Sequence, residues 1–223
     1  MPLMPEILPP ALAAAGWIVA LPMLVWAALR AHRECWHRPL QQHAWLGAIV
    51  AVALLWSLAV RSPAGPGFGL LGGALFALLF GRALAMLGLA TAALLVTLLD
   101  GGGWIHLGMT IVLLALLPAW LATALQRRIE RWLPHNVFVF IIGNGLFVTL
   151  ATTAAISVLA MTLAVATQAP QHLLSDHLAY ALLLAWGEAL LSGMLFSALV
   201  IFAPRAVRTY DQDLYLPMSR SAP

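Results

Sequence analysis

Residues 104–125 read WIHLGMTIVLLALLPAWLATAL, a run of 22 residues that contains no Asp, Glu, Lys or Arg. About 20 predominantly apolar residues in a helix are enough to cross the hydrocarbon core of a bilayer. The whole chain of 223 residues is 63% hydrophobic and 9% charged, with a mean hydropathy of +0.95. Soluble domains are typically about 45–50% apolar and about 25% charged. The sequence therefore predicts an all-α integral membrane protein and excludes a water-soluble fold.

Six further apolar runs accompany this one. The seven predicted transmembrane helices cover roughly residues 12–29, 44–60, 67–81, 83–99, 104–125, 136–166 and 178–203. The third run is short and rich in glycine, and only Gly81 and Arg82 separate it from the fourth. It is therefore a candidate for a tilted or partly re-entrant segment packed inside the protein. We interpret residues 1–223 as a single polytopic membrane domain.

The basic residues predict the orientation of the chain, since cytoplasmic loops accumulate Arg and Lys. All eleven are arginines, and a topology with the N-terminus outside leaves only Arg61 on the outer side. The ten on the inner side are Arg30, Arg33, Arg38, Arg82, Arg127, Arg128, Arg131, Arg205, Arg208 and Arg220. We predict an inner-membrane protein with its N-terminus outside and its C-terminus in the cytoplasm. Topology accounts for the basic pI, so we expect membrane lipid and not nucleic acid as a partner.

Motifs of familiar enzymes do not occur in the sequence. It contains no Gly-x-Ser-x-Gly elbow, no His-Glu-x-x-His pair, no phosphate-binding loop and no Cys-x-x-Cys pair. An intramembrane hydrolase would need a nucleophile beside a base, and Ser157 or Ser192 with a histidine is the minor alternative of this kind. The sequence predicts that the protein is not an enzyme.

Two polar side chains fall deep within predicted spans. Glu188 is a carboxylate in the last span, and an ionisable group at that depth is costly and normally faces the bundle interior or a cavity. It either has a functional role or hydrogen-bonds to a neighbouring helix and holds the bundle together. Asn144 lies between two glycines, and its amide either lines a path or bonds two helices. With Asp100 on the outer side, these residues are the candidate substrate-binding groups.

Three histidines, His106, His172 and His177, fall on or near the predicted outer side. Neutral imidazoles suit nickel, cobalt, copper or zinc. His106 and His177 are therefore candidate metal ligands. The alternative is that each is a solvated or hydrogen-bonded side chain at the membrane interface.

Residues 68–109 read FGLLGGALFALLFGRALAMLGLATAALLVTLLDGGGWIHLGM. A glycine-rich helix start comes first, followed by a two-residue break. A second helix then ends in Asp-Gly-Gly before Leu-Gly. This order and spacing resembles the membrane substrate-binding component of cobalt and nickel energy-coupling-factor transporters, the CbiM/NikM type. The later segments LPHNVFVFIIGNGLFV and VRTYDQDLYL are similar to a divergent proteobacterial branch of that family.

The resemblance implies a substrate-binding subunit of a transporter in the bacterial inner membrane. A nickel or cobalt ion would be its substrate and not a permanently bound cofactor. The implied partners are a transmembrane coupling subunit and ATP-hydrolysing subunits, because the chain has no nucleotide site of its own.

Two departures from the family pattern affect the implied metal site. The family has a Met-His N-terminus and the histidine of a His-Leu-Leu-Gly segment as ligands, whereas this chain has Pro2 and Gly69 at those positions. Loss of two imidazoles should abolish tight nickel or cobalt binding by the inherited mechanism. The alternative function is a non-transporting accessory or assembly protein that keeps the fold.

Overall fold

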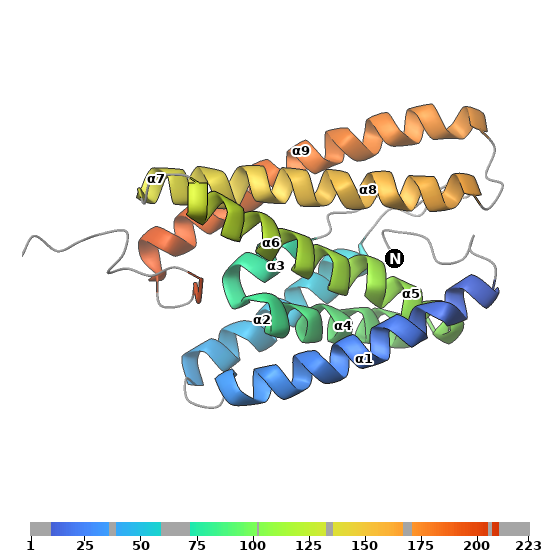
Figure 1. Cartoon of the computed structure of the whole chain (residues 1–223), viewed down its shortest axis with the longest axis horizontal. Coiled ribbons are helices and arrows are strands. Elements are labelled where there is room, and N and C mark those ends of the chain that lie inside the picture. Colours follow the sequence, from blue (N-terminus) through green and yellow to red (C-terminus); the bar gives the residue numbers. More distant parts are fainter. Residues whose placement is uncertain are drawn as a thin grey trace, which may run out of the picture.

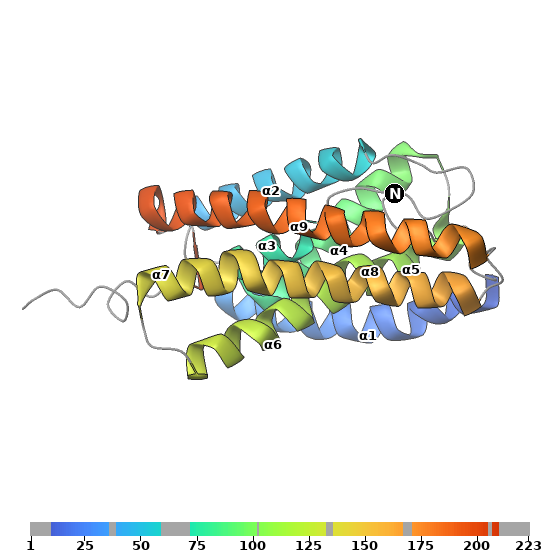
Figure 2. The same ribbon diagram turned by 90° about the horizontal axis from the view of Figure 1, so that it is seen from above.

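The computed structural model describes residues 10–35, 39–58, 72–101, 103–132, 136–166, 171–204 and 207–209. Within these ranges every regular element is a helix and no residue lies in a strand. The long helices lie side by side along the long axis of the molecule (Figures 1 and 2). The predicted all-α architecture is confirmed.

Each of the seven predicted spans corresponds to one helical rod in the described part of the chain. The first four rods are single helices, α1 (Pro10–Cys35), α2 (Pro39–Ser57), α3 (Gly73–Phe80) and α4 (Arg82–Leu99). The fifth joins α5 (Trp104–Ile111), the π-helix η1 (Val112–Leu116) and α6 (Leu117–Trp132). The sixth joins α7 (Val137–Phe140), the π-helix η2 (Ile141–Val148) and α8 (Thr149–Ala166), and the last is α9 (Gln171–Phe202).

Within the described ranges, five segments are long and apolar enough to cross a membrane. They are Ala13–Ala31, Arg82–Leu99, Trp104–Trp132, Val137–Leu163 and Ala179–Phe202. Helices α2 and α3 are not among them. The chain is therefore a multi-pass membrane protein, whereas the predicted sidedness of its termini stays a prediction.

Helix α3 is short and lies inside the bundle (Figure 1). Seven of its eight residues are buried. Eight helical residues span about 12 Å, well short of a hydrocarbon core of about 30 Å. The helix lies between Gly72 and Gly81, whose φ angles of 64° and 79° favour glycine. The described part of the third run is thus a short internal helix, as its sequence suggested, and residues 67–71 of that run lie outside the described ranges.

Both ends of α3 are hydrogen-bonded to the C-terminal part of the chain. At the first end the Gly72 N–H group donates to Glu188 of α9. At the other end the Arg208 N–H group donates to the Leu79 carbonyl at 2.8 Å, and the Thr209 hydroxyl donates to the Leu78 carbonyl. Backbone groups at depth must be satisfied by protein, since lipid offers no partners. The last helix and the segment after it therefore hold the central short helix in place.

The two π-helical segments have local causes in the sequence. Pro118 follows η1 closely, and a proline cannot donate the hydrogen bond that an α-helix would direct to residue 114. The helix widens there, so that the Leu117 N–H group donates to the Val112 carbonyl, five residues back. Segment η2 contains Gly143-Asn144-Gly145, and glycines weaken the α-helical preference. Single π-helical turns within α-helices are frequent at functional sites.

Helices α1 and α5 meet at two glycines. A Cβ atom on Gly16 would lie 2.3 Å from the Met109 backbone nitrogen, and one on Gly108 would lie 2.7 Å from the Trp17 side chain. Small residues of this kind let helix backbones approach closely, which is how helices pack in a membrane. The contact between the first and fifth predicted spans therefore depends on glycine.

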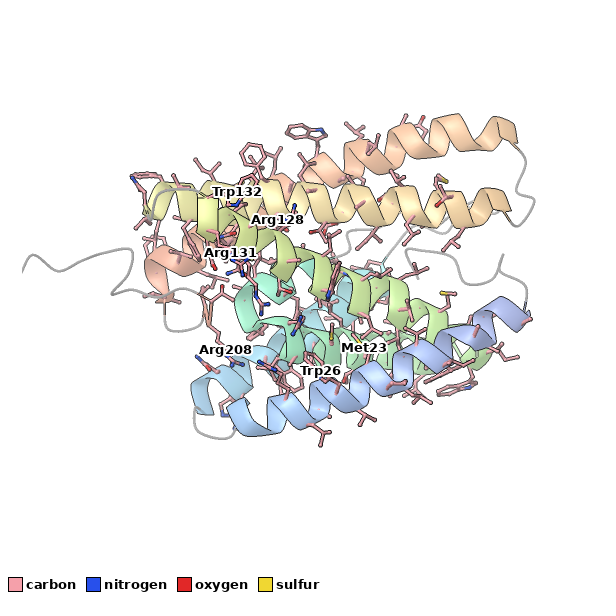
Figure 3. The ribbon with its side chains drawn as sticks, viewed as in Figure 1. Met23, Trp26, Arg128, Arg131, Trp132 and Arg208 are labelled. Atoms are coloured by element: carbon pink, nitrogen blue, oxygen red, sulfur yellow. The ribbon has the colours of Figure 1, made fainter. Side chains whose placement is uncertain are left out.

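Arginines gather at one end of the bundle. Figure 3 shows Arg128, Arg131 and Trp132 at the end of α6, and Arg208 after α9 lies towards the same end. The turn between α4 and α5 and the start of α9 lie at the opposite end (Figures 1 and 2). The grouping of these arginines at one end agrees with the predicted topology, in which successive loops alternate between the two sides of the membrane.

The close contact at Gly16 predicts that a larger residue there lowers the stability of the protein. Gly16→Ala should lower the free energy of unfolding by about 1–3 kcal/mol, because the added methyl group overlaps the α5 backbone. Gly47→Ala is the matched control, since a Cβ atom there meets nothing within 4 Å. Thermal unfolding in detergent measures both variants, and equal melting temperatures would contradict the tight α1–α5 contact.

Candidate functional site

Glu188 lies in α9 with 2% of its surface exposed. Its Oε1 atom accepts a hydrogen bond from the Gly72 N–H group at 2.8 Å. The N-terminal end of a helix carries a partial positive charge, so a carboxylate at the start of α3 is favourably placed. The prediction that Glu188 contacts a neighbouring helix is confirmed, and its partner lies 116 residues away in sequence.

Asn144 lies in η2 and is fully buried, with 0% exposure. Among the described residues, neither its Oδ1 nor its Nδ2 atom has a hydrogen-bond partner. The alternative that this amide bonds two helices together is therefore wrong for the described structure. A buried amide without partners costs free energy, because it has given up its bonds to water.

Two threonines on the same rod share this property. Thr149 and Thr152 are buried at 0% and 1% exposure, and neither hydroxyl has a hydrogen-bond partner in the part of the chain that the structure describes. Sequence reasoning missed both, because threonine in an apolar span is ordinary. The signal that could have found them is their spacing from Asn144. Eight residues already return to the same side of an α-helix, whereas five residues do so only when a π-turn intervenes.

The crossing of η2 and α9 determines which residues of the two helices lie at the same level. A Cβ atom on Gly145 would lie 3.1 Å from the Gly193 Cα atom, so the two backbones meet there. Helices α8 and α9 run antiparallel (Figure 1). A residue five positions before Gly193 in α9 therefore lies at about the same level along the bundle as a residue five positions after Gly145. At about 1.5 Å of rise per residue, this places Glu188 near the level of Thr149 and Thr152.

We call the resulting set the polar seam; its members are Asn144, Thr149, Thr152, Glu188 and Ser192. Ser192 is also buried and lies next to the glycine crossing, one helical turn from Glu188. The seam offers one carboxylate, one amide and three hydroxyl groups among the buried side chains of the bundle. Oxygen donors of these kinds suit hard cations such as manganese, magnesium or calcium better than soft ones.

Asp100 and His106 lie at a different place, beside the turn between α4 and α5. Asp100 is exposed at the end of α4. The His106 N–H group of the backbone donates to the Gly103 carbonyl at 3.0 Å, and the imidazole Nδ1 atom is buried without a hydrogen-bond partner. The structure therefore does not bring these two residues to Glu188 and Asn144.

The proposed pair of metal-ligand histidines stays a prediction. His177 belongs to the first turns of α9, but its side chain lies outside what the structure describes. Among the side chains that are described, no three from His, Cys, Asp and Glu come together as a metal site would require. Pro2 and Gly69 also lie outside the described residues.

The unpartnered hydroxyls predict an unusual response to mutation. Thr149→Val keeps the shape and removes a buried polar atom without a partner, so the free energy of unfolding should rise by about 1 kcal/mol. Thr97→Val is the matched control, because the Thr97 hydroxyl is buried and donates to the Ala93 carbonyl at 2.8 Å. The control should not gain stability. Thermal unfolding that shows equal losses for both would mean that Thr149 has a partner in the protein.

Comparisons with known proteins identify the family. Residues 3–206 match the CbiM family, described as the cobalt uptake substrate-specific transmembrane region. A crystal structure of a transition metal transporter has the same fold, with a TM-score of 0.70, 17% identity and coverage of 88% of this chain and 92% of that one. A truncated transition metal transporter gives a TM-score of 0.63 and 19% identity, with 89% and 98% covered. No curated protein sequence matches significantly. The family match spans nearly the whole chain, and the protein belongs to the CbiM family.

Proposed function

We propose that this chain is the substrate-binding membrane component of a transition-metal uptake system in the bacterial inner membrane. The observation that carries the proposal is the match to the CbiM family over residues 3–206. The family is described by an uptake role and not by an enzymatic one. The polar seam supports the proposal from within the structure, since it provides charged and polar oxygen atoms in the interior of a membrane bundle.

Glu188 would be the principal contact for the transported ion. A divalent cation beside it would compensate its negative charge in surroundings of low dielectric constant, where an unpaired charge is costly. The Asn144 amide and the hydroxyls of Thr149 and Thr152 would then contribute oxygen atoms to the ion or to its bound water. Within the described part of the chain these groups have no hydrogen-bond partner.

The donor set affects selectivity. The seam contains no imidazole or thiolate, and Pro2 and Gly69 stand where the family pattern has histidines. Oxygen ligands bind nickel and cobalt less tightly than imidazoles do, and they also accept manganese. We therefore propose a cobalt- or nickel-type uptake component whose binding is weaker and less selective than that of members with the histidines.

Energy for transport would come from other subunits. The sequence contains no phosphate-binding loop. By analogy with the family, a transmembrane coupling subunit and ATP-hydrolysing subunits would drive release of the ion into the cytoplasm. Loss of the histidine ligands favours a second candidate, an accessory membrane protein that keeps the fold without transport.

Uptake by cells tests the role of Glu188. Glu188→Gln keeps an oxygen that can accept from the Gly72 N–H group but removes the charge, so accumulation of radioactive cobalt or nickel should fall at least tenfold. The control is Glu130→Gln, because the Glu130 carboxylate accepts from Gln126 at the arginine-rich end, far along the chain from the seam. The measurement uses the native host with the chromosomal copy replaced, at matched protein levels. Unchanged uptake in Glu188→Gln would exclude the seam as the ion path.

Calorimetric titration distinguishes the seam from the histidines. The purified protein in detergent is titrated with nickel, cobalt, manganese and zinc, beside Glu188→Gln and a variant with both His106→Ala and His177→Ala. We expect saturable binding that Glu188→Gln loses and the double variant keeps. The opposite pattern would move the metal site to the histidines. No binding by any form, together with no uptake, would favour the accessory role.

A further inference from the structure

The predicted inner side of the chain carries more basic than acidic residues. Ten arginines fall on the predicted inner side, against four acidic residues, Glu34, Glu130, Asp211 and Asp213. Among the described side chains on this side, Glu130 already accepts a hydrogen bond from Gln126 at 2.8 Å. Charged groups near a membrane surface attract the opposite charge of lipid headgroups.

Two of these arginines converge on one tryptophan. The Arg30 guanidinium carbon lies 5.7 Å from the Trp26 ring centroid, and that of Arg82 lies 4.7 Å from it. Trp26 and Arg30 belong to α1, whereas Arg82 begins α4, so two helices contribute to the cluster. Figure 3 shows Trp26 on α1, about one turn from Met23 and nearer to the end of the bundle where Arg208 lies. The ring holds both guanidinium groups in place by cation–π contacts.

These cations repel one another. Arg30 and Arg82 both lie against the Trp26 ring, so their like charges are close to one another. Bringing guanidinium groups together in this way is compensated when an anion binds between them. Guanidinium binds phosphate through two parallel N–H···O bonds, so a phosphate group matches this cluster in charge and in geometry.

An apolar surface leads along α1 to the same cluster. Leu21, Val25 and Leu29 are all exposed and follow one another at intervals of four residues, which places them on one face of the helix. Tryptophan rings prefer the headgroup level of a bilayer. A free phosphate ion would use only the arginines, whereas a phospholipid would use the arginines and this apolar face together.

We propose that an anionic phospholipid binds at this place, with its phosphate between Arg30 and Arg82 beside Trp26 and an acyl chain along Leu21, Val25 and Leu29. The site is separate from the polar seam and does not depend on the transported ion. Basic residues near a membrane surface each contribute about fivefold to the affinity for anionic lipid.

Native mass spectrometry of the full-length protein in detergent tests the proposal. It is titrated with phosphatidylglycerol and with phosphatidylcholine of the same acyl chains. We expect phosphatidylglycerol to bind at least fivefold more tightly, and inorganic phosphate at millimolar concentration not to displace it. Arg82→Gln should weaken phosphatidylglycerol binding about fivefold, and Arg30→Gln serves the same purpose if Arg82→Gln does not fold.

Arg131→Gln is the matched control, because it removes the same charge from α6 at a distance from Trp26 (Figure 3). It should change the affinity less than twofold. Equal affinities for the two lipids would overturn the proposal. Equal losses in Arg131→Gln and Arg82→Gln would also overturn it, since they would mean a general charge effect and no defined site. Displacement by inorganic phosphate would mean an anion site and not a lipid site.

Discussion

The hydrogen bond from the Gly72 N–H group to Glu188 is the contact on which the centre of this structure depends. Inside a bilayer each backbone group needs a partner from the protein. A helix of only eight residues has many unpaired end groups for its length. Here α9 supplies a carboxylate for one end of α3, and the Arg208 and Thr209 contacts serve the other end. A short buried helix is tolerated because the last helix and its continuation satisfy its ends.

The same contact gives Glu188 two roles that need not compete. A carboxylate can accept more than one hydrogen bond and can also bind a cation. Glu188 holds α3 through Gly72, and in the proposed function it would also contact the transported ion. Because α3 is attached to the carboxylate, an ion bound there would act directly on the position of α3. The structure thus links the buried carboxylate of α9 to the shortest of the seven helical rods.

Sequence reasoning predicted the parts of this arrangement that depend on local composition. The apolar runs, the break at Gly81 and the unusual depth of Glu188 are all visible along the chain. The partner of Glu188 was not, since it lies 116 residues away. The threonines were missed because threonine is ordinary in an apolar span, and the alignment of Thr149 with Asn144 was hidden for a geometric reason. At about 100° per residue, positions 144 and 149 differ by about 140° on an α-helix. The π-turn of η2 brings them to one face, and no simple sequence rule predicts such a turn.

The comparison with the transition metal transporters separates what preserves the fold from what binds the ion. The fold persists at 17% identity, because it depends on helix packing that many sequences satisfy, with glycine needed only at close contacts such as Gly16 with Met109. Metal ligands contribute little to this packing, so a shared fold does not by itself show which ion a chain binds. Retaining unpartnered amide and hydroxyl groups in the core, in contrast, costs stability. Selection for stability alone would have replaced them with apolar residues. Their presence beside Glu188 therefore favours a bound polar species over a purely structural role for the seam.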